Sequence, residues 1–317
     1  VFAILEMGMN HPGEIAPLSE LARPDVAIIT TVEAVHTEFF SSTAEIADAK
    51  AEIFAGMGEQ GIAILNRDNP HFDRLARAAL ARGLQVVVGF GVHPDAEVRM
   101  TDCKIDGETT EVRAILNEQP LGYVLGVAGR HWAMNSLAVI TAIAAAGGNV
   151  RHTIHALSEM TAPRGRGSRH TVPLAHGTFQ LIDESYNASP VSVAAAIAVL
   201  GTALPAPGGR RIAVLGDMRE LGEQTVSLHV GLRTSILAHG IDLVFTAGPN
   251  MAHLHQSLPA PLRGDHADRS EDLAPMVARA VRAGDVVMVK GSAGSRTGII
   301  VRTLNSPHIN DETAGAH

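Results

Sequence analysis

Short apolar runs alternate along most of the chain with longer segments whose apolar residues recur every three or four positions. β-Branched runs at 26–30, 61–65 and 86–90 each stand beside a segment of this helical periodicity. Such an alternation is typical of βαβ units around a parallel sheet. The same pattern predicts a further strand at 1–5, with Glu6 at its carboxyl end.

The alternation is interrupted between residues 97 and 128. This region predicts consecutive antiparallel strands, with Asp106 and Gly107 forming a turn. Two helices are predicted to follow, at 131–146 and 151–160.

A segment rich in Arg, Gly and Pro at 163–173 lacks hydrophobic periodicity, and strands alternate with helices again after it. We interpret this segment as a domain boundary. The sequence therefore predicts an α/β fold with two doubly wound domains, residues 1–163 and residues 164–317.

The composition excludes several classes of protein. Of the 317 residues, 46% are hydrophobic and 3% are aromatic, and the formal net charge is −8. Few aromatics argue against a platform for stacking bases or sugars, and the sequence has no basic stripe typical of nucleic-acid binding. Cys103 is the sole cysteine, which fits a reducing cytoplasm. No uncharged apolar run reaches the ~18 residues of a membrane span, so we expect a cytoplasmic protein with no membrane span and no nucleic-acid partner.

Candidate ligand-binding residues lie where the predicted parallel strands end, because open parallel sheets bind ligands outside these carboxyl ends. Glu6 would lie at one such end, and His36 follows the strand at 26–30 by a few residues. Both have simpler interpretations, since a strand-end carboxylate is often a helix cap or a surface group, and a lone His after a strand is more often structural.

A third candidate, Lys50, lies on a predicted helix that begins near Ser42 and Glu45, which have the spacing of a capping box. Lys50 shares the apolar face of this helix with Ile46 and Ile53. The simpler interpretation is that its stem is packed and its charge stays in water. The alternative is a neutral amine, made accessible by burial, that takes up carbon dioxide and binds a metal ion as a carbamate.

Glu6, His36 and Lys50 could converge above adjacent strand ends and hold a divalent cation. Magnesium prefers oxygen ligands, so a carboxylate, a carbamate and phosphate oxygens around one imidazole would suit it. Asp48 and Glu52 lie off the apolar face and are interpreted as solvated charges.

Several motifs between residue 4 and about residue 301 resemble, in the same order, those of the Mur ligase family. The central domain of that family is indicated by EMGMNHPGEI, VHTEFF, DAKAEIF and GRHWAMNSLA. The member that adds D-alanyl-D-alanine to a UDP-N-acetylmuramoyl tripeptide is indicated by LIDESYNASP, VLGDMRELGEQ and VKGSAGS.

The resemblance implies metal-binding roles in the central domain. Glu6 and His36 match positions at which the family holds a magnesium ion, and Lys50 matches a carbamylated lysine. These three residues are also the implied catalytic residues.

The resemblance further implies an ATP site. His131 and Asn135 match positions that line the adenine pocket, although this chain has Trp132 where the family usually has Asn. Arg166 best matches a linker arginine that reaches the ATP phosphates, with Arg164 and Arg169 as competitors. Asp183 matches an acidic residue of the last domain that contacts the nucleotide ribose. Tyr186 and Asn187 match the same nucleotide-facing surface.

Substrate contacts are implied at two motifs. Asn10, His11 and Glu14 of NHPGE are expected to face substrate. Lys290 and Ser292 of VKGS would hold the carboxylate of the amino substrate, although a KGS turn at a strand end is often structural.

The family also has a UDP-binding domain, and a P-loop that opens the ATPase domain. The printed sequence contains no G-x-x-x-x-G-K-[ST] motif, and none of its three lysines follows a glycine. We therefore expect that Val1 is not the natural start. The two domains would be a P-loop-type ATPase central domain truncated before its P-loop, and a Rossmann-like C-terminal domain.

The implied activity is that of an ATP- and Mg²⁺-dependent amide-bond ligase of peptidoglycan precursor synthesis. Its substrates would be the UDP-N-acetylmuramoyl tripeptide and D-alanyl-D-alanine, and the protein would be a monomer. One alternative is a sister Mur ligase or a folylpolyglutamate-type synthetase with another amino substrate. The other is an inactive fragment that binds nucleotide weakly through its last domain.

Overall fold

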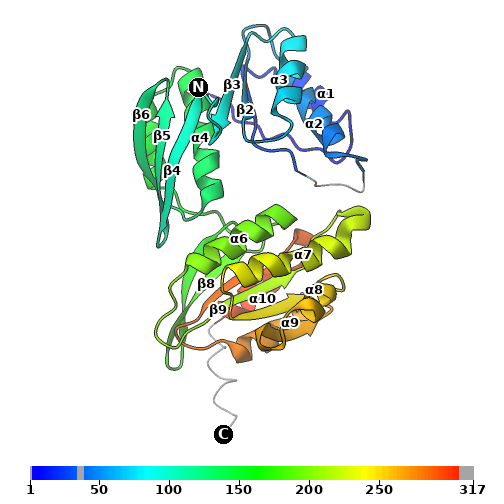
Figure 1. Ribbon diagram of the computed structural model, residues 1–317, viewed down its shortest axis with the longest axis vertical. Coiled ribbons are helices and arrows are strands. Elements are labelled where there is room, and N and C mark those ends of the chain that lie inside the picture. Colours follow the sequence, from blue (N-terminus) through cyan, green and yellow to red (C-terminus); the bar gives the residue numbers. More distant parts are fainter. Residues whose placement is uncertain (1, 34–38, 307–317) are drawn as a thin grey trace. The chain divides into compact units, whose positions relative to one another are not determined.

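The computed structural model describes residues 2–33 and 39–306, and the chain divides into two compact units, Val1–Met160 and Thr161–His317 (Figure 1). Within the described residues, each unit has a six-stranded sheet with helices packed against it. The predicted α/β class, with two sheets built mainly from parallel strands, is confirmed.

In the first unit, the strands follow one another in space in the order of the sequence. Neighbours are parallel from β1 to β4 and antiparallel from β4 to β6. The predicted turn at Asp106 and Gly107 joins β4 to β5, and Gly107 has a φ of 59°, which glycine adopts without strain. The described strands are β1 (Val26–Ile29), β2 (Ile62–Asn66), β3 (Val86–Gly91), β4 (Val98–Asp106), β5 (Thr109–Leu116) and β6 (Gln119–Leu125).

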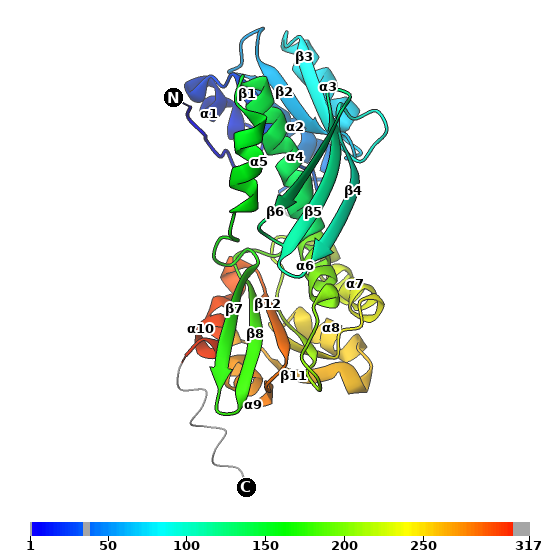
Figure 2. The same cartoon turned by 90° about the vertical axis from the view of Figure 1, so that its left-hand side faces the viewer.

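Helices cover both faces of this sheet (Figure 2). Ala63 and Leu65 of β2 join an apolar core with residues of α1, α2 and α3. Ile64 lies between them and is fully buried on the opposite face, where α4 packs across the strands. The helical segments are α1 (Ile15–Ala22), α2 (Thr43–Ala51), η1 (Glu52–Phe54), α3 (Phe72–Ala81), α4 (Arg130–Ala145) and α5 (Val150–Ser158).

In the second unit, the strand order is β11-β10-β9-β12-β8-β7, and all neighbours are parallel except β7 and β8. Residues of β9 alternate between two cores, with Ala213 and Leu215 facing α6 to α8, and Ile212 and Val214 facing α9 and α10. The strands are β7 (Ser168–Leu174), β8 (Gly177–Glu184), β9 (Arg211–Gly216), β10 (Leu243–Ala247), β11 (Arg263–Ala267) and β12 (Val286–Lys290). The helical segments are α6 (Pro190–Thr202), η2 (Gly222–Gln224), α7 (Thr225–Ala238), α8 (Met251–Ser257), η3 (Ala260–Leu262), α9 (Ser270–Ala280), η4 (Ala293–Ser295) and α10 (Gly298–Leu304).

This topology determines where a ligand site is expected in the second unit. The connections from β8 to β9 and from β9 to β10 lie on one face of the sheet, and the connection that leads to β12 lies on the other. The carboxyl ends of β8, β12 and β9 are therefore neighbours at the point where the connections diverge. Doubly wound sheets bind ligands at such a point.

The prediction of a strand at 1–5 is wrong for residues 2–5, and Val1 lies outside the described residues. Residues 2–9 form neither helix nor strand, and Phe2, Ile4 and Leu5 are 74%, 95% and 63% exposed. A strand requires hydrogen bonds to a neighbour, and this segment pairs with none of the described strands. Its apolar character alone could not reveal that.

The segment at 163–173, interpreted as a boundary loop, contains most of strand β7. This strand pairs with β8 at the edge of the sheet, and Val172 is its buried residue. The other residues of β7 are partly or fully exposed, which weakens the hydrophobic signal, and an edge strand tolerates Pro173.

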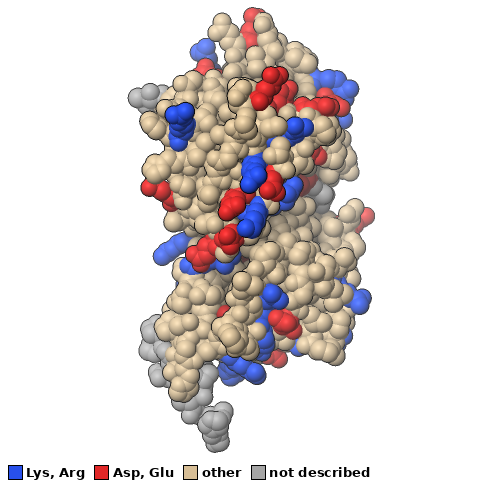
Figure 3. All heavy atoms as spheres, turned by 60° about the vertical axis from the view of Figure 1, so that its left-hand side comes forward, with Lys and Arg blue, Asp and Glu red and all other residues tan. Residues whose placement is uncertain are grey.

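Charged residues on β4 and β5 stand in pairs of opposite sign. The register places Asp102 opposite Arg113 and Lys104 opposite Glu111, an arrangement that stabilises an antiparallel pair modestly. Positive and negative side chains also alternate on the face in Figure 3.

None of the helices in the described ranges is long and apolar enough to cross a membrane.

Candidate functional site

Lys50 lies at the end of α2. As predicted, Ser42 caps this helix by accepting a hydrogen bond from the Glu45 N–H at 3.3 Å, although the Glu45 carboxylate binds Ser41 instead of completing the box. The Lys50 side chain is partly buried. Burial lowers the pKa of its amine, and the nearby carboxylate of Glu33 opposes that shift.

Glu33 is a residue that the sequence reasoning missed. Burial raises the pKa of its carboxyl group, while Thr31 Oγ1 at 3.3 Å and the charge of Lys50 lower it. Glu33 follows β1 in the chain, so the rule used for Glu6 and His36 could have found it. It adds a carboxylate to the surroundings of Lys50.

The other two predicted metal ligands are not brought together by the described structure. Glu6 is exposed in the segment without regular structure, and His36 lies outside the described residues. Within 2–33 and 39–306, no three His, Cys, Asp or Glu residues are placed to hold a metal ion. The trio of Glu6, His36 and Lys50 stays a prediction.

The residues Asn10–Glu14, the NHPGE loop, are exposed and held by hydrogen bonds within the loop. The Glu14 carboxylate accepts hydrogen bonds from the N–H groups of Asn10 and His11 at 2.7 and 3.2 Å, which lower its pKa. His11 Nδ1 lies 3.1 Å from Glu14 Oε1, and the His11 ring contacts Phe39 with 4.6 Å between centroids. Glu14 thus shapes the loop, and its contact with substrate stays a prediction.

His131 and Asn135 lie on the first turns of α4, four residues apart on one exposed side of the helix. Trp132 is partly buried, and its ring lies 5.4 Å from that of His131. Gly129 precedes the helix with a φ of 139° and donates to Thr110 Oγ1 at 3.0 Å. The predicted adenine residues therefore share one surface at the start of a helix.

In the second unit, the predicted nucleotide residues meet at the end of β8. The buried carboxylate of Asp183 accepts hydrogen bonds from Gly165 N at 3.1 Å, and from Ser185 N and Oγ at 3.0 and 2.6 Å. The guanidinium of Arg166 lies over the ring of Tyr186, 4.3 Å from its centroid. The Arg/Gly segment is thus attached to the turn after β8, and this attachment brings Arg166, Asp183 and Tyr186 together.

Lys290 ends β12 and is 3% exposed. Its ammonium donates to Glu184 Oε2 at 3.3 Å and to the carbonyl oxygen of Asn187 at 2.9 Å. Burial lowers the pKa of Lys290 and raises the pKa of Glu184, and the attraction between the two charges opposes both shifts. Lys290 therefore connects β12 to the same turn after β8, a contact that sequence reasoning did not anticipate.

Ser292 is also engaged within the protein. Its hydroxyl donates to the carbonyl oxygen of Asp217 at 2.7 Å, and the residue is 5% exposed. The roles predicted for Lys290 and Ser292 in holding a substrate carboxylate stay predictions, and both side chains have structural contacts that the sequence did not indicate.

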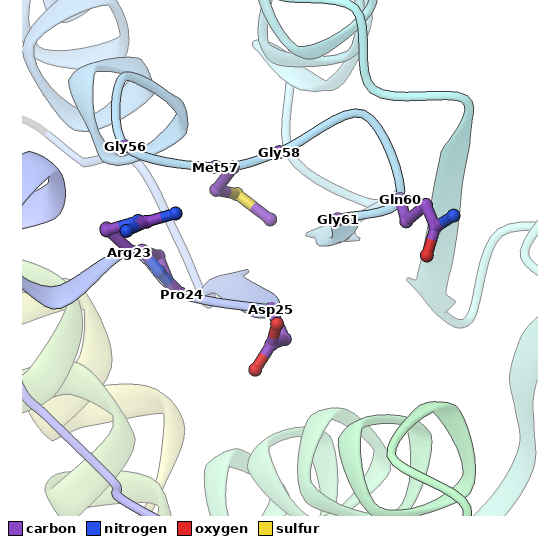
Figure 4. Close-up of a pocket in the computed structure, with 8 residues that line it drawn as sticks. All are labelled: Arg23, Pro24, Asp25, Gly56, Met57, Gly58, Gln60 and Gly61. Carbon is purple, nitrogen blue, oxygen red and sulfur yellow. The ribbon is translucent and has the colours of Figure 1, made fainter.

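A hollow of about 440 Å³ lies at the other end of the first sheet (Figure 4). Its lining residues, Arg23–Asp25, Gly56–Gly58, Gln60 and Gly61, immediately precede β1 and β2 or follow η1. It is thus at the amino ends of these strands, opposite the edge where the sequence places the ligand residues, and none of the predicted site residues lines it.

Comparison with known protein families gives two matches along the chain. Residues 1–143 match the Mur ligase middle domain, and residues 169–293 match the Mur ligase, glutamate ligase domain. The chain belongs to the Mur ligase family. Arg164 and Arg166 fall between the two Mur ligase matches, Lys50 and His131 fall in the first, and Lys290 falls in the second.

Two curated Mur ligases illustrate the similarity. The UDP-N-acetylmuramoyl-tripeptide–D-alanyl-D-alanine ligase of Escherichia coli is 32% identical to this chain over 306 residues. The ligase of the same name from Rickettsia prowazekii is 28% identical to this chain over 300 residues. These alignments cover 96% and 95% of this chain, and the chain spans 65% of the length of each relative.

Solved Mur ligases share the fold. MurF from Acinetobacter baumannii matches with a TM-score of 0.82 at 22% identity, covering 95% of this chain and 64% of that one. MurF ligase from Thermotoga maritima in complex with ADP matches with a TM-score of 0.77 at 24% identity, covering 93% and 64%. The MurC structure from Thermotoga maritima gives a lower TM-score of 0.65 at 16% identity.

Proposed function

We propose that this chain contributes the central and C-terminal domains of an ATP-dependent ligase that joins D-alanyl-D-alanine to a UDP-N-acetylmuramoyl tripeptide. The observation that carries the proposal is the similarity, over 95% or more of the chain, to ligases named for this reaction. The motifs that resemble this member of the family lie on the turns after β8, β9 and β12, where the second sheet is expected to bind ligands.

In the proposed reaction, a carboxylate oxygen of the tripeptide attacks the γ-phosphorus of ATP, and ADP leaves. The amine of D-alanyl-D-alanine then attacks the carbonyl carbon of the acyl phosphate. The bond to phosphate breaks, phosphate leaves, and the new amide nitrogen loses a proton. Such a sequence requires positioned reactants and stabilisation of negative charge more than covalent chemistry by the protein.

Nucleotide contacts are proposed for residues within each unit, considered separately. His131 and Asn135 would contact adenine, Arg166 the phosphates, and Asp183 the ribose. The exposed ring of Tyr186 supports this assignment for Arg166, because its contact holds the guanidinium in a defined place. The printed sequence contains no P-loop, so the proposed activity requires a phosphate-binding loop in the same protein.

A magnesium ion is proposed at Glu6, His36 and Lys50. The described residues support the amine chemistry of this site, because burial lowers the pKa of Lys50, against the opposing charge of Glu33, and so raises the fraction of neutral amine. That amine could add to carbon dioxide and release a proton, giving a carbamate. A carbamate, a carboxylate and an imidazole form a donor set suited to a divalent cation, which would neutralise phosphate charge.

The proposal is tested with the protein expressed from the complete reading frame that contains this chain. Phosphate release is measured with ATP, Mg²⁺ and the UDP-tripeptide, with D-alanyl-D-alanine compared against single amino acids. We expect release to depend on the dipeptide. Equal or greater release with a single amino acid would favour a sister ligase and contradict the proposal.

A further inference from the structure

The amino end of α1 is held by a carboxylate from a distant part of the sequence. The first N–H groups of a helix have no partners within the helix, and Glu14 at the N-cap forms no side-chain cap bond. Glu52 supplies it instead. Its Oε1 accepts a hydrogen bond from Gly13 N at 2.6 Å, and its Oε2 accepts from Ile15 N and Ala16 N at 3.1 and 3.2 Å.

This arrangement corrects the interpretation of Glu52 as a solvated charge. Glu52 is partly buried, and its negative charge at the helix amino end interacts favourably with the helix dipole. Asp48, the other residue given that interpretation, is exposed and pairs with Arg74 at 2.6 Å.

Because Glu52 caps α1, the Glu14 side chain is available to the NHPGE loop. Its hydrogen bonds to Asn10 and His11 close the loop on one side, while the bond from Gly13 to Glu52 attaches it on the other. Gly13 has a φ of 87°, which other residues rarely adopt, so a glycine is needed here for the backbone to present this N–H to Glu52.

Glu52 immediately follows the helix that carries Lys50. Residues two apart on helical backbone point to different sides. Here the charge of Glu33 acts on Lys50, while Glu52 reaches the amino end of α1. One helix end therefore contacts both the predicted metal site and the predicted substrate loop.

A second attachment keeps α1 docked without Glu52. Ser19 Oγ donates to the carbonyl oxygen of Ile53 at 2.5 Å and accepts from Gly56 N at 3.0 Å, and both Ser19 and Ile15 are buried. Loss of the Glu52 carboxylate should thus loosen the NHPGE loop and leave the helix in place.

We propose that Glu52 is a positioning residue that fixes the NHPGE loop relative to Lys50, so that the loop can receive the UDP-tripeptide. This inference rests on the proposed function and on the substrate contacts predicted for Asn10, His11 and Glu14. It predicts that Glu52 affects recognition of the tripeptide more than the chemical steps or the binding of ATP.

The test compares Glu52→Gln and Glu52→Ala in the protein from the complete reading frame. Gln retains one acceptor oxygen and loses the charge, and Ala retains neither. We expect the KM for the UDP-tripeptide to rise about tenfold in Glu52→Ala, as for the loss of a charged hydrogen bond, and less in Glu52→Gln. The kcat and the KM for ATP should change less than about twofold on the same reasoning.

Glu20→Gln is the matched control, because Glu20 is an exposed carboxylate on the same helix, and it should leave all constants unchanged. Hydrogen exchange at Gly13, Ile15 and Ala16 should accelerate in Glu52→Ala and not in the control. An unchanged KM for the tripeptide, or an equal loss in every constant, would overturn the inference. Absence of ligase activity in the unmodified protein would instead overturn the proposed function.

Discussion

Two lysines of this chain each feel the charge of a glutamate, and their surroundings differ in a way that separates two roles. Lys290 is 3% exposed and donates hydrogen bonds to Glu184 and to the carbonyl oxygen of Asn187. Lys50 is less buried, and the described residues act on it through burial and through the charge of Glu33.

The comparison shows that a buried lysine at a predicted site can serve the fold. Lys290 compensates the buried carboxylate of Glu184 and holds the turn after β8, which carries Tyr186 and directly follows the strand that ends with Asp183 and Glu184. Removing one partner of such a pair is costly, because the other charge remains buried. Lys50 has a lowered pKa, and it lies two residues before Glu52, which holds the NHPGE loop; this placement favours a chemical role.

The largest expected effect is the loss of activity in Lys50→Ala. If Lys50 organises charge around the phosphates, kcat should fall about a hundred- to a thousandfold, as when an electrostatic group of an active site is removed. Thermal unfolding should change little, since the substitution removes a partly buried charge. The kcat and the temperature of thermal unfolding are both measured on the protein from the complete reading frame.

Lys104→Ala is the matched control for this experiment, because Lys104 is an exposed lysine on β4. It should retain full activity. Near-normal turnover in Lys50→Ala would remove the basis for the proposed metal site and for the contrast with Lys290.

The next effect is on stability and concerns Lys290. Lys290→Met leaves the carboxylate of Glu184, whose side chain is 15% exposed, without its cation. We expect the free energy of unfolding to fall by about 3 kcal/mol, measured by urea denaturation followed through the second unit.

A double variant sharpens this prediction. Lys290→Met with Glu184→Gln removes both charges, and it should be more stable than Lys290→Met alone because no buried carboxylate is left unpaired. If Lys290→Met unfolds at the same urea concentration as the unmodified protein, the structural role of Lys290 is refuted.

The sequence allowed prediction of those parts of the fold that depend on local patterns. The buried runs of β9 and β12 and the capped start of α2 could be located from the periodicity and from Ser42. Strand β7 could not, because an edge strand with one buried residue lacks a pattern. The strand expected at 1–5 failed for the opposite reason, since an apolar run does not reveal whether a partner strand is present.

The residues of the candidate site also fall into those that the sequence could indicate and those that it could not. Lys50 could be selected from its position on an apolar helix face, and its partial burial agrees with that position. The contacts of Glu52 and Lys290 join residues far apart in the sequence, 36–39 positions for Glu52 and 103–106 for Lys290. Pairings of this kind arise from tertiary packing, and no spacing rule within one element could have predicted them.

The smallest expected effect is a difference in amine reactivity, and it tests the two lysines directly. Trace acylation in carbonate-free buffer, followed by mass spectrometry of the lysine peptides, reports the neutral fraction and the accessibility of each amine. The ordinary pKa of a lysine amine is 10.5, and burial lowers the pKa of Lys50. Lys50 should therefore reach half-maximal labelling below pH 10.5. Lys290 should be labelled slowly at every pH, since its amine is enclosed by Glu184 and Asn187. Glu33→Gln should shift the Lys50 profile to still lower pH, because the Glu33 carboxylate raises the pKa of Lys50. A Lys50 profile centred at 10.5 or above, or one that moves upward in Glu33→Gln, would contradict the effects of burial and of Glu33 on this amine. Labelling of Lys290 as fast as that of Lys50 would contradict the difference between the two lysines.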